Sequence, residues 1–183
     1  MLKAIRHHWP ETITFLLPIM NKLFNLARRC YEVVVLSANF LRSPLLLFLR
    51  VYFFWQLFLT GIGKLSNIGK ISEYFTTLGI PLPTLNAYLA GATETFCSLF
   101  LILGLASRLA AIPVLFTMIV AYLTADQEAV AGMLSNSDKF VKADPFPFLL
   151  IALIVLAFGP GQLSVDALFK QKLWHSAGTK PDR

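Results

Sequence analysis

The stretch that decides the fold is residues 45–63, LLLFLRVYFFWQLFLTGIG, which contains one charge, Arg50, and one amide, Gln56. A helix rises about 1.5 Å per residue, so the stretch matches a bilayer hydrocarbon core about 30 Å thick. Pro44 directly precedes it, and proline is common in the first turn of a helix. The stretch therefore predicts a transmembrane helix that begins at Pro44.

The composition of the whole chain is that of a membrane protein. Of its 183 residues, 56% are hydrophobic and 14% are charged, whereas about 25% of residues are charged in an average soluble domain. The net charge of +6 could suggest nucleic acid as a partner, but the basic residues flank the apolar segments and form no stripe on a soluble face. The composition therefore predicts an integral membrane protein without a nucleic-acid partner.

Three further apolar segments complete the predicted fold. The second and third spans are joined by a very short turn near Gly104 and Arg108, so they are expected to form an antiparallel hairpin. Asp144-Pro145 supplies a cap and a first-turn proline for the fourth, which is short for a spanning helix. The predicted spans after 45–63 are about residues 84–105, 109–125 and 146–160. The predicted fold class is an all-α, four-helix transmembrane bundle over residues 44–169.

The residues before this bundle, 1–43, are basic and amphipathic. Between residues 22 and 42, apolar residues recur at helical spacing with basic ones between them, which is typical of a helix lying in the lipid headgroup layer. The apolar run within residues 1–19 is broken by Pro18 and does not resemble a signal peptide, so a poorly structured extension is expected there. Residues 170–183 form a basic tail.

The distribution of lysine and arginine predicts the orientation. In a four-span protein both termini and the turn at Arg108 share one side of the membrane, and these segments hold eleven Lys and Arg residues. The other two loops hold four. The excess of basic residues marks the cytoplasmic side. The sequence therefore predicts a multi-pass protein of the bacterial inner membrane with both termini in the cytoplasm.

Two charged residues, Arg50 and Glu94, lie inside predicted spans, where a charge costs a few kcal/mol unless it is paired or hydrated. Measured from the cytoplasmic ends of their antiparallel helices, Arg50 lies about 9 Å and Glu94 about 16 Å deep at 1.5 Å per residue. An ion pair between them is therefore predicted. It could be a structural pair that fixes helix register, or a polar pocket for a headgroup, a quinone ring or a proton. Gly91 and Ser98 share the stripe of Glu94 and leave room beside it, so Arg50, Glu94 and Ser98 are the predicted intramembrane polar site.

No catalytic residue can be named from the sequence, and whether the protein is an enzyme stays open. The three histidines lie in the tails, so none is placed to hold a haem between helices. The spacing of Cys, His and carboxylates fits no metal site, and no nucleotide-binding fingerprint is present. A permease would need a continuous polar path, of which only Glu94 and Ser98 give a hint. We therefore expect no metal and no covalent cofactor, and any redox role would use a quinone or the cofactor of a partner.

Six short motifs, in this order, resemble the DoxX family. They are Leu49-Arg50, Gly61-x-Gly63-Lys64, Gly79-Ile80-Pro81-Leu82-Pro83, Ala90-Gly91-x-x-Glu94, Leu103-Gly104-Leu105-x-x-Arg108 and Gly159-Pro160-Gly161-x-x-Ser164-x-Asp166. DoxX-like proteins are four-helix inner-membrane proteins, and the name comes from a small subunit of a thiosulfate:quinone oxidoreductase. The resemblance thus implies a link to quinone-coupled oxidation, although most members have no established activity and some look like accessory or assembly subunits. Among the residues that carry over, Lys64, Arg108 and Asp166 would hold helix ends and contact lipid headgroups or partner chains.

The resemblance leads to one expected function and one alternative. The first is a membrane subunit of a quinone-linked or other redox complex, which binds a quinone or lipid between the first two spans at the level of Glu94. The alternative is a non-catalytic scaffold, anchor or assembly factor, which tight packing of those two helices would favour. Membrane lipid and another subunit or a second copy are the expected partners, and the long loop 126–144 is a candidate docking segment.

Overall fold

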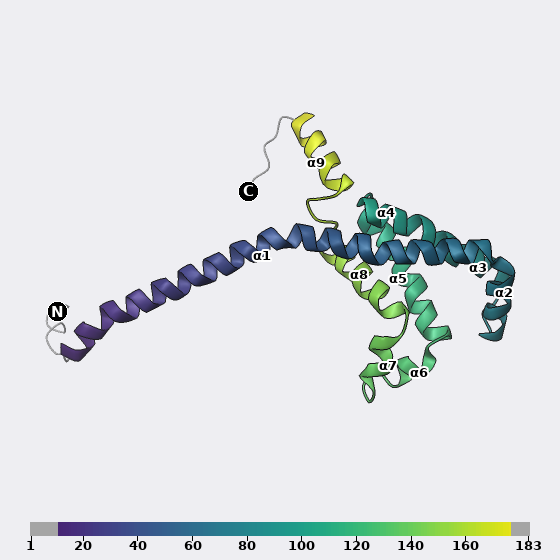
Figure 1. The fold of residues 1–183 in the computed structure, drawn as a ribbon, viewed down its shortest axis with the longest axis horizontal. Coiled ribbons are helices and arrows are strands. Elements are labelled where there is room, and N and C mark those ends of the chain that lie inside the picture. The colour runs from purple at the N-terminus through teal and green to yellow at the C-terminus, as the bar shows by residue number, and fades with distance from the viewer. Residues whose placement is uncertain (1–10, 177–183) are drawn as a thin grey trace, which may run out of the picture. The chain divides into compact units, whose positions relative to one another are not determined.

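The structure, a computed structural model, describes the backbone of residues 11–176 and the side chains of residues 20–172. The elements described over this range are all helices (Figure 1). They are α1 (Glu11–Ser66), α2 (Ile68–Thr77), α3 (Pro83–Ala92), the π-helical turn η1 (Thr93–Cys97), α4 (Ser98–Leu103), α5 (Ser107–Thr124), α6 (Gln127–Ala131), α7 (Ser137–Lys142), α8 (Pro145–Phe158) and α9 (Val165–Ser176). The predicted all-α fold class is confirmed.

Helix α1 continues through the position where the sequence predicts the first span to begin. Pro44 lies inside α1 and does not open a new helix, although a proline in a helix interior removes one backbone hydrogen bond. Residues 11–19 also belong to α1, so the expected poorly structured extension is wrong for them, and residues 1–10 lie outside the described part. The chain divides into two compact units between Arg42 and Ser43.

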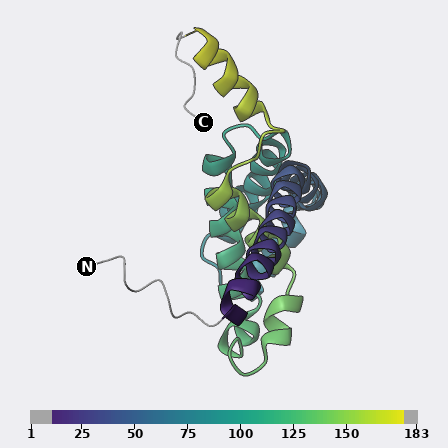
Figure 2. The same cartoon turned by 90° about the vertical axis from the view of Figure 1, so that its left-hand side faces the viewer.

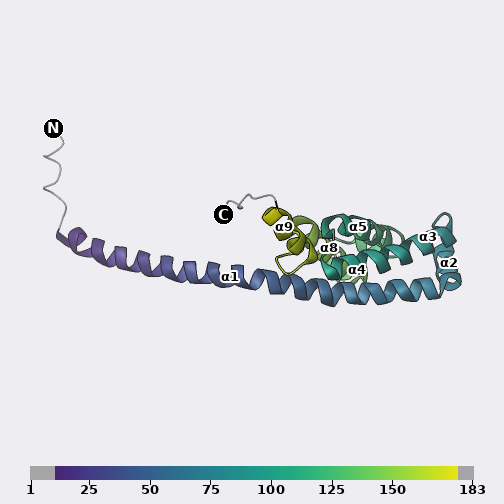
Figure 3. The same cartoon turned by 90° about the horizontal axis from the view of Figure 1, so that it is seen from above.

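In the second unit, the helices pack on one side of residues 43–66 of α1, as Figures 2 and 3 show from two directions. The core joins α1, α4, α5 and α8, and α5 packs extensively along α8. Its buried apolar side chains are Phe54, Leu57, Leu101, Ala110, Ala111, Val114, Met118, Ile151, Ala152 and Val155. The opposite side of this part of α1 carries exposed apolar side chains, among them Phe48, Trp55 and Leu59. An apolar face of this kind is what lipid or a partner helix covers.

Both long connections contain helices of their own. α2 lies between the first two apolar helices and packs against α3, and the turn between α2 and α3 has Gly79 and Leu82 in the left-handed region. α6 and α7 lie within the predicted loop 126–144, so that segment is folded. Asp144 occupies the N-cap position of α8, as predicted, but its side chain makes no capping hydrogen bond.

Over the described residues, three helical stretches are long and apolar enough to cross a membrane: Met20–Ser66, Pro83–Leu103 and Ser107–Thr124. The second of these joins α3, η1 and α4 into one rod. α8 is apolar but has 14 residues, fewer than the roughly 20 that usually span a bilayer. The protein is an all-α membrane protein, and its fourth span stays a prediction.

Candidate functional site

The close approach of α1 and the α3–α4 rod sets the geometry of the site. A Cβ atom built on Gly61 would lie 2.5 Å from Thr95 Oγ1 and 2.6 Å from the Thr95 backbone nitrogen. Real Cβ contacts are essentially never that short, so this position has room only for glycine. Gly91 lies against the side chain of Leu65 in the same way. The two helices are therefore in backbone contact at this level, as small residues allow within a membrane.

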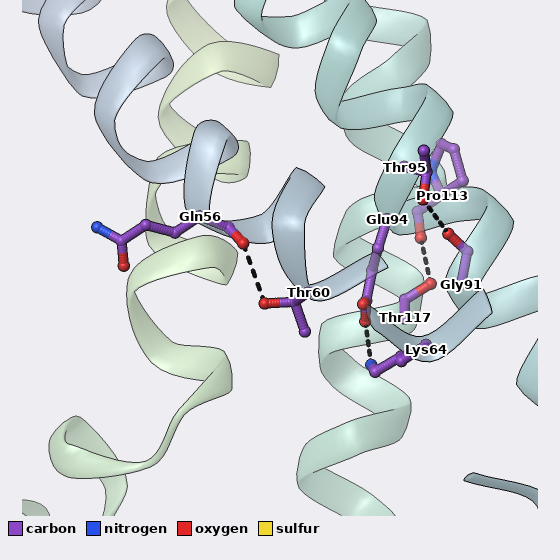
Figure 4. Close-up of polar contacts among 8 residues, drawn as sticks. All are labelled: Gln56, Thr60, Lys64, Gly91, Glu94, Thr95, Pro113 and Thr117. Atoms are coloured by element: carbon purple, nitrogen blue, oxygen red, sulfur yellow. Dashed lines mark hydrogen bonds and ion pairs between the residues drawn. The ribbon is translucent and has the colours of Figure 1, made fainter. Parts of the chain in front are cut away.

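One turn away from this contact, Lys64 and Glu94 form an ion pair between the helices. The Lys64 Nζ donates to Glu94 Oε1 over 2.5 Å (Figure 4). The Glu94 side chain is 2% exposed and that of Lys64 is 24% exposed, so the carboxylate is enclosed while the ammonium stays near the surface of the bundle. Thr117 and Pro113 of α5 are drawn on the neighbouring helix in the same view. The pair joins α1 to η1 at a point where both charges would otherwise lie among apolar side chains.

Arg50 takes part in a different contact, so the predicted Arg50–Glu94 pair is wrong. Its Nη2 donates to the carbonyl of Leu163 over 2.7 Å, and its guanidinium lies against Gly104. Arg50 is therefore level with the end of α4, whereas Glu94 is ten residues earlier on that rod, about 15 Å away at 1.5 Å per residue. The prediction failed because it assumed that the two helix ends were level.

Glu94 lies in the π-helical turn η1, and part of its side chain has no partner. Glu94 Oε2 and the Ser98 hydroxyl are buried and have no hydrogen-bond partner among the described residues. Arg50 Nε and Nη1 are also buried without a hydrogen-bond partner among the described residues. Single π-helical turns within α-helices frequently occur at functional sites, and an unpaired buried polar group carries a desolvation cost of about 1–3 kcal/mol. The predicted residues Arg50, Glu94 and Ser98 are thus all buried, but Arg50 belongs to a separate location.

A second polar cluster forms where α4, α5 and α9 meet. Asp166 Oδ1 accepts from the backbone nitrogen of Ala106 over 2.7 Å, and its Oδ2 accepts from that of Ser107 over 3.0 Å. The Asp166 backbone nitrogen in turn donates to the Gly104 carbonyl. Ala106 has a left-handed backbone and no side-chain acceptor at the start of α5, so a carboxylate distant in sequence caps that helix.

Arg108 contacts the C-terminal end of α8, as Asp166 contacts the N-terminal end of α5. Its Nη2 donates to the carbonyl of Ala157 over 3.3 Å, and its guanidinium lies beside Gly159. A cation is favourable at the negative end of a helix dipole. Arg108 and Asp166 therefore hold helix ends, as the resemblance implied; their contacts with headgroups or partners stay a prediction.

The motif residues thus gather in two places. Arg50, Gly104 and Asp166 lie together near the start of α5. Lys64 and Glu94 lie together at the Gly61 contact. The sequence reasoning missed Lys64 as the partner of Glu94, although a signal was present: Gly61-x-x-Lys64 and Gly91-x-x-Glu94 each place a charge one turn after a small residue.

An open cleft lies among the ends of α2 and α5 and the helices α6 and α7, with a volume of about 900 Å³. Its walls carry both signs of charge, with Lys139 3.4 Å from Glu128 and Lys142 3.3 Å from Asp138. In the described part of the chain, no group of three or more His, Cys, Asp or Glu residues is placed to hold a metal ion. The cleft is therefore a mixed-charge surface, formed by the segment predicted as a docking loop.

The fold and these contacts define a helical membrane protein whose intramembrane charges tie one helix to another. The family model DoxX matches residues 45–127. This segment, 83 of the 183 residues, is therefore a DoxX-family segment. It covers five of the six motifs and ends before the one at Gly159. Comparison with curated proteins and with solved structures gives no match.

Proposed function

We propose that this DoxX-family protein is a non-catalytic scaffold or anchor in the bacterial inner membrane, serving a partner such as a quinone-linked or other redox complex. The observation that carries the proposal is the backbone contact at Gly61 and Thr95. It closes the space between α1 and the α3–α4 rod next to Glu94, where a quinone or lipid was expected. Tight packing there favours the alternative that the charges lock the bundle.

The use of the other motif charges supports the same function. Arg50 binds a carbonyl of the segment that precedes α9, Asp166 caps α5, and Arg108 binds a carbonyl at the end of α8. Each therefore connects segments that are distant in sequence. Charges in such positions fix which helices meet and at what register, and a scaffold needs a rigid arrangement of this kind.

Two surfaces are available for the partner. The exposed apolar face of α1 over residues 43–66 suits a transmembrane helix of another subunit or of a second copy. The mixed-charge cleft at α6 and α7 suits a polar segment of the partner outside the bilayer. With both termini in the cytoplasm, as the basic residues favour, this cleft would face the outside.

A second candidate function rests on the unpaired atoms of the π-helical turn. Glu94 Oε2 and Ser98 Oγ are buried and could accept from, or donate to, the polar head of a quinone or lipid. The head would have to approach from a side other than the closed contact with Gly61. This candidate keeps the expected link to quinone chemistry, with Glu94 and Ser98 as ligand-contacting residues.

One experiment separates the two functions. A photoreactive amino acid is placed at the exposed Trp55 or Leu59, with the buried Leu57 as the matched control, and the protein is cross-linked in its native membrane. The scaffold proposal expects one defined partner band at Trp55 and Leu59 and none at Leu57.

The same preparation is then extracted for lipids and quinones. Enrichment of a quinone over the bulk membrane, lost in both Glu94→Ala and Ser98→Ala while the protein stays inserted, would support the second candidate. No partner band at either exposed position would contradict the scaffold function.

A further inference from the structure

The stretch Met20–Ser66 is too long to lie entirely within a bilayer. It has 47 residues, about 70 Å at 1.5 Å per residue, against a hydrocarbon core of about 30 Å. The family match begins at residue 45, and the boundary between the compact units lies between Arg42 and Ser43. The helical residues from Met20 to Arg42 therefore cannot lie in the same hydrocarbon span as residues 43–66, and they must contact a different environment.

The side chains of this helix are exposed and mostly apolar. Leu23 is 61% exposed, Phe24 is 70% exposed and Tyr31 is 70% exposed. The other large exposed apolar residues are Met20, Leu26, Val33, Val34, Val35, Leu36, Phe40 and Leu41. So much exposed apolar surface is not stable in water and indicates a membrane or protein partner.

The apolar residues lie on one broad face. At 100° per residue, most apolar positions, among them Leu23, Cys30 and Val34, fall within an arc of about 200°. The remaining arc holds Lys22, Arg28 and Arg29. A coiled-coil seam is narrower than this. The width therefore favours a bilayer surface over a single partner helix.

The exceptions to this pattern are consistent with a membrane surface. Ser37 lies on the apolar face, but its hydroxyl donates to the Val33 carbonyl over 2.8 Å and needs no water. Leu36 and Phe40 lie on the polar side, both within the last two turns before Ser43. There the helix approaches the spanning segment, so apolar residues all round are expected.

The charge of this helix specifies the lipid. Residues 20–42 contain Lys22, Arg28, Arg29 and Arg42 and a single acidic residue, Glu32, which pairs with Arg28 over 2.9 Å. Lys22, Arg28 and Arg29 lie on the polar face, whereas Arg42 falls on the apolar face in the last turn before Ser43. The polar face is thus basic, and basic residues at a membrane surface attract anionic phospholipids.

We infer that the helix Met20–Arg42 lies in the interface of a membrane rich in anionic phospholipid. Its Leu23, Cys30 and Val34 side contacts acyl chains, and Lys22 and Arg29 lie among the phosphates. The inference is independent of the scaffold function, because it concerns a different part of the chain.

The two cysteines provide the test on the full-length protein. An environment-sensitive fluorophore is attached at Cys30, on the apolar face, in a Cys97→Ala background. The matched control carries it on the polar face, at Asn25→Cys with Cys30→Ala. Both proteins are reconstituted in vesicles of phosphatidylcholine alone or mixed with phosphatidylglycerol. The Cys30 label should report an apolar environment when phosphatidylglycerol is present, and the Asn25→Cys label should report water in both.

Two further variants test whether the helix prefers anionic lipid. Arg29→Gln should reduce the ratio of membrane-bound to free helix about five-fold, the equivalent of about 1 kcal/mol for one basic residue, while Asn39→Gln should leave it unchanged. An apolar signal that is equal in both lipids would overturn the anionic specificity. A water-exposed Cys30 in both lipids, or efficient Cys30–Cys30 cross-linking in both, would overturn the membrane site, the latter in favour of a second copy.

Discussion

Glu94 depends on the ion pair more than Lys64 does. The Glu94 side chain is 2% exposed, whereas that of Lys64 is 24% exposed. A lysine can redirect its long side chain toward the membrane surface, but an enclosed carboxylate cannot. The loss of Lys64 therefore strands a charge, while the loss of Glu94 leaves one that can move away.

This asymmetry gives the first prediction. Lys64→Met should lower the melting temperature of the detergent-solubilised protein more than Glu94→Gln does, because breaking a buried pair typically costs about 3–5 kcal/mol. The double variant should be more stable than Lys64→Met alone. Thermal unfolding of the three variants measures this, and Arg50→Met combined with Glu94→Gln serves as the control, whose effects should add. Additive effects for Lys64 and Glu94 would show that the two side chains are not coupled.

The second prediction compares two glycines of α1. Gly61→Ala should destabilise the protein by about 1–3 kcal/mol, because the added methyl group meets the backbone of Thr95 and the helices must separate. Gly63→Ala is the matched control, since a Cβ there meets nothing within 4 Å and alanine favours a helix by up to about 1 kcal/mol. Urea or thermal unfolding in detergent should rank Gly63→Ala above wild type and Gly61→Ala below it. Equal stabilities would mean that the contact at Thr95 is looser than described.

At the scale of elements, the hairpin of α4 and α5 is closed by a residue far from both. The turn at Gly104 and Ala106 has left-handed backbone, and the first N–H groups of α5 have no local acceptor. Asp166, in the first turn of α9, provides both carboxylate oxygens. The start of α9 thus stabilises a turn 59 or 60 positions earlier in the chain.

The third prediction follows from that cap. Asp166→Ala should destabilise the protein by about 0.5–2 kcal/mol, the usual cost of losing an N-cap acceptor. Asp144→Ala is the matched control, because Asp144 occupies a cap position but makes no capping hydrogen bond, and its effect should stay within about 0.5 kcal/mol. Amide hydrogen exchange should increase at Ser107 in the first variant only. Unchanged exchange at that amide would contradict the role of Asp166.

At the scale of the whole molecule, α8 decides how the chain crosses the membrane. It has 14 residues, or about 21 Å at 1.5 Å per residue, which is less than the hydrocarbon core. Its packing against α5 nevertheless places it in the core of the bundle, with Ile151, Ala152 and Val155 buried. A short span of this kind is accommodated when the bilayer thins locally.

The fourth prediction tests this topology. A reporter fused after Arg183 should report the cytoplasm, and one inserted at Ser135 should report the outside, because the basic residues concentrate beside the termini and the turn at Arg108. Two reporters, alkaline phosphatase and a fluorescent protein, distinguish the two sides of the membrane. If the two positions report the same side, α8 does not cross the membrane.

The sequence by itself determined that this is an all-α membrane protein and where its apolar helices lie. Each backbone polar group in a bilayer must be satisfied within its own helix, so a span can be recognised from the length and composition of a local run. The same reasoning located the buried residues Arg50, Glu94 and Ser98, because a charge or hydroxyl inside such a run is visible without any knowledge of its neighbours.

Only the tertiary structure decided which charges meet. The register between α1 and the α3–α4 rod is set by two contacts, Gly61 with Thr95 and Arg50 with Gly104. This register brings Glu94 within hydrogen-bonding distance of Lys64. Register depends on the contacts of small side chains on two helices at once, which neither helix specifies alone. The passage of α1 through Pro44 also depends on context, since one proline permits either a helix start or a continuous helix.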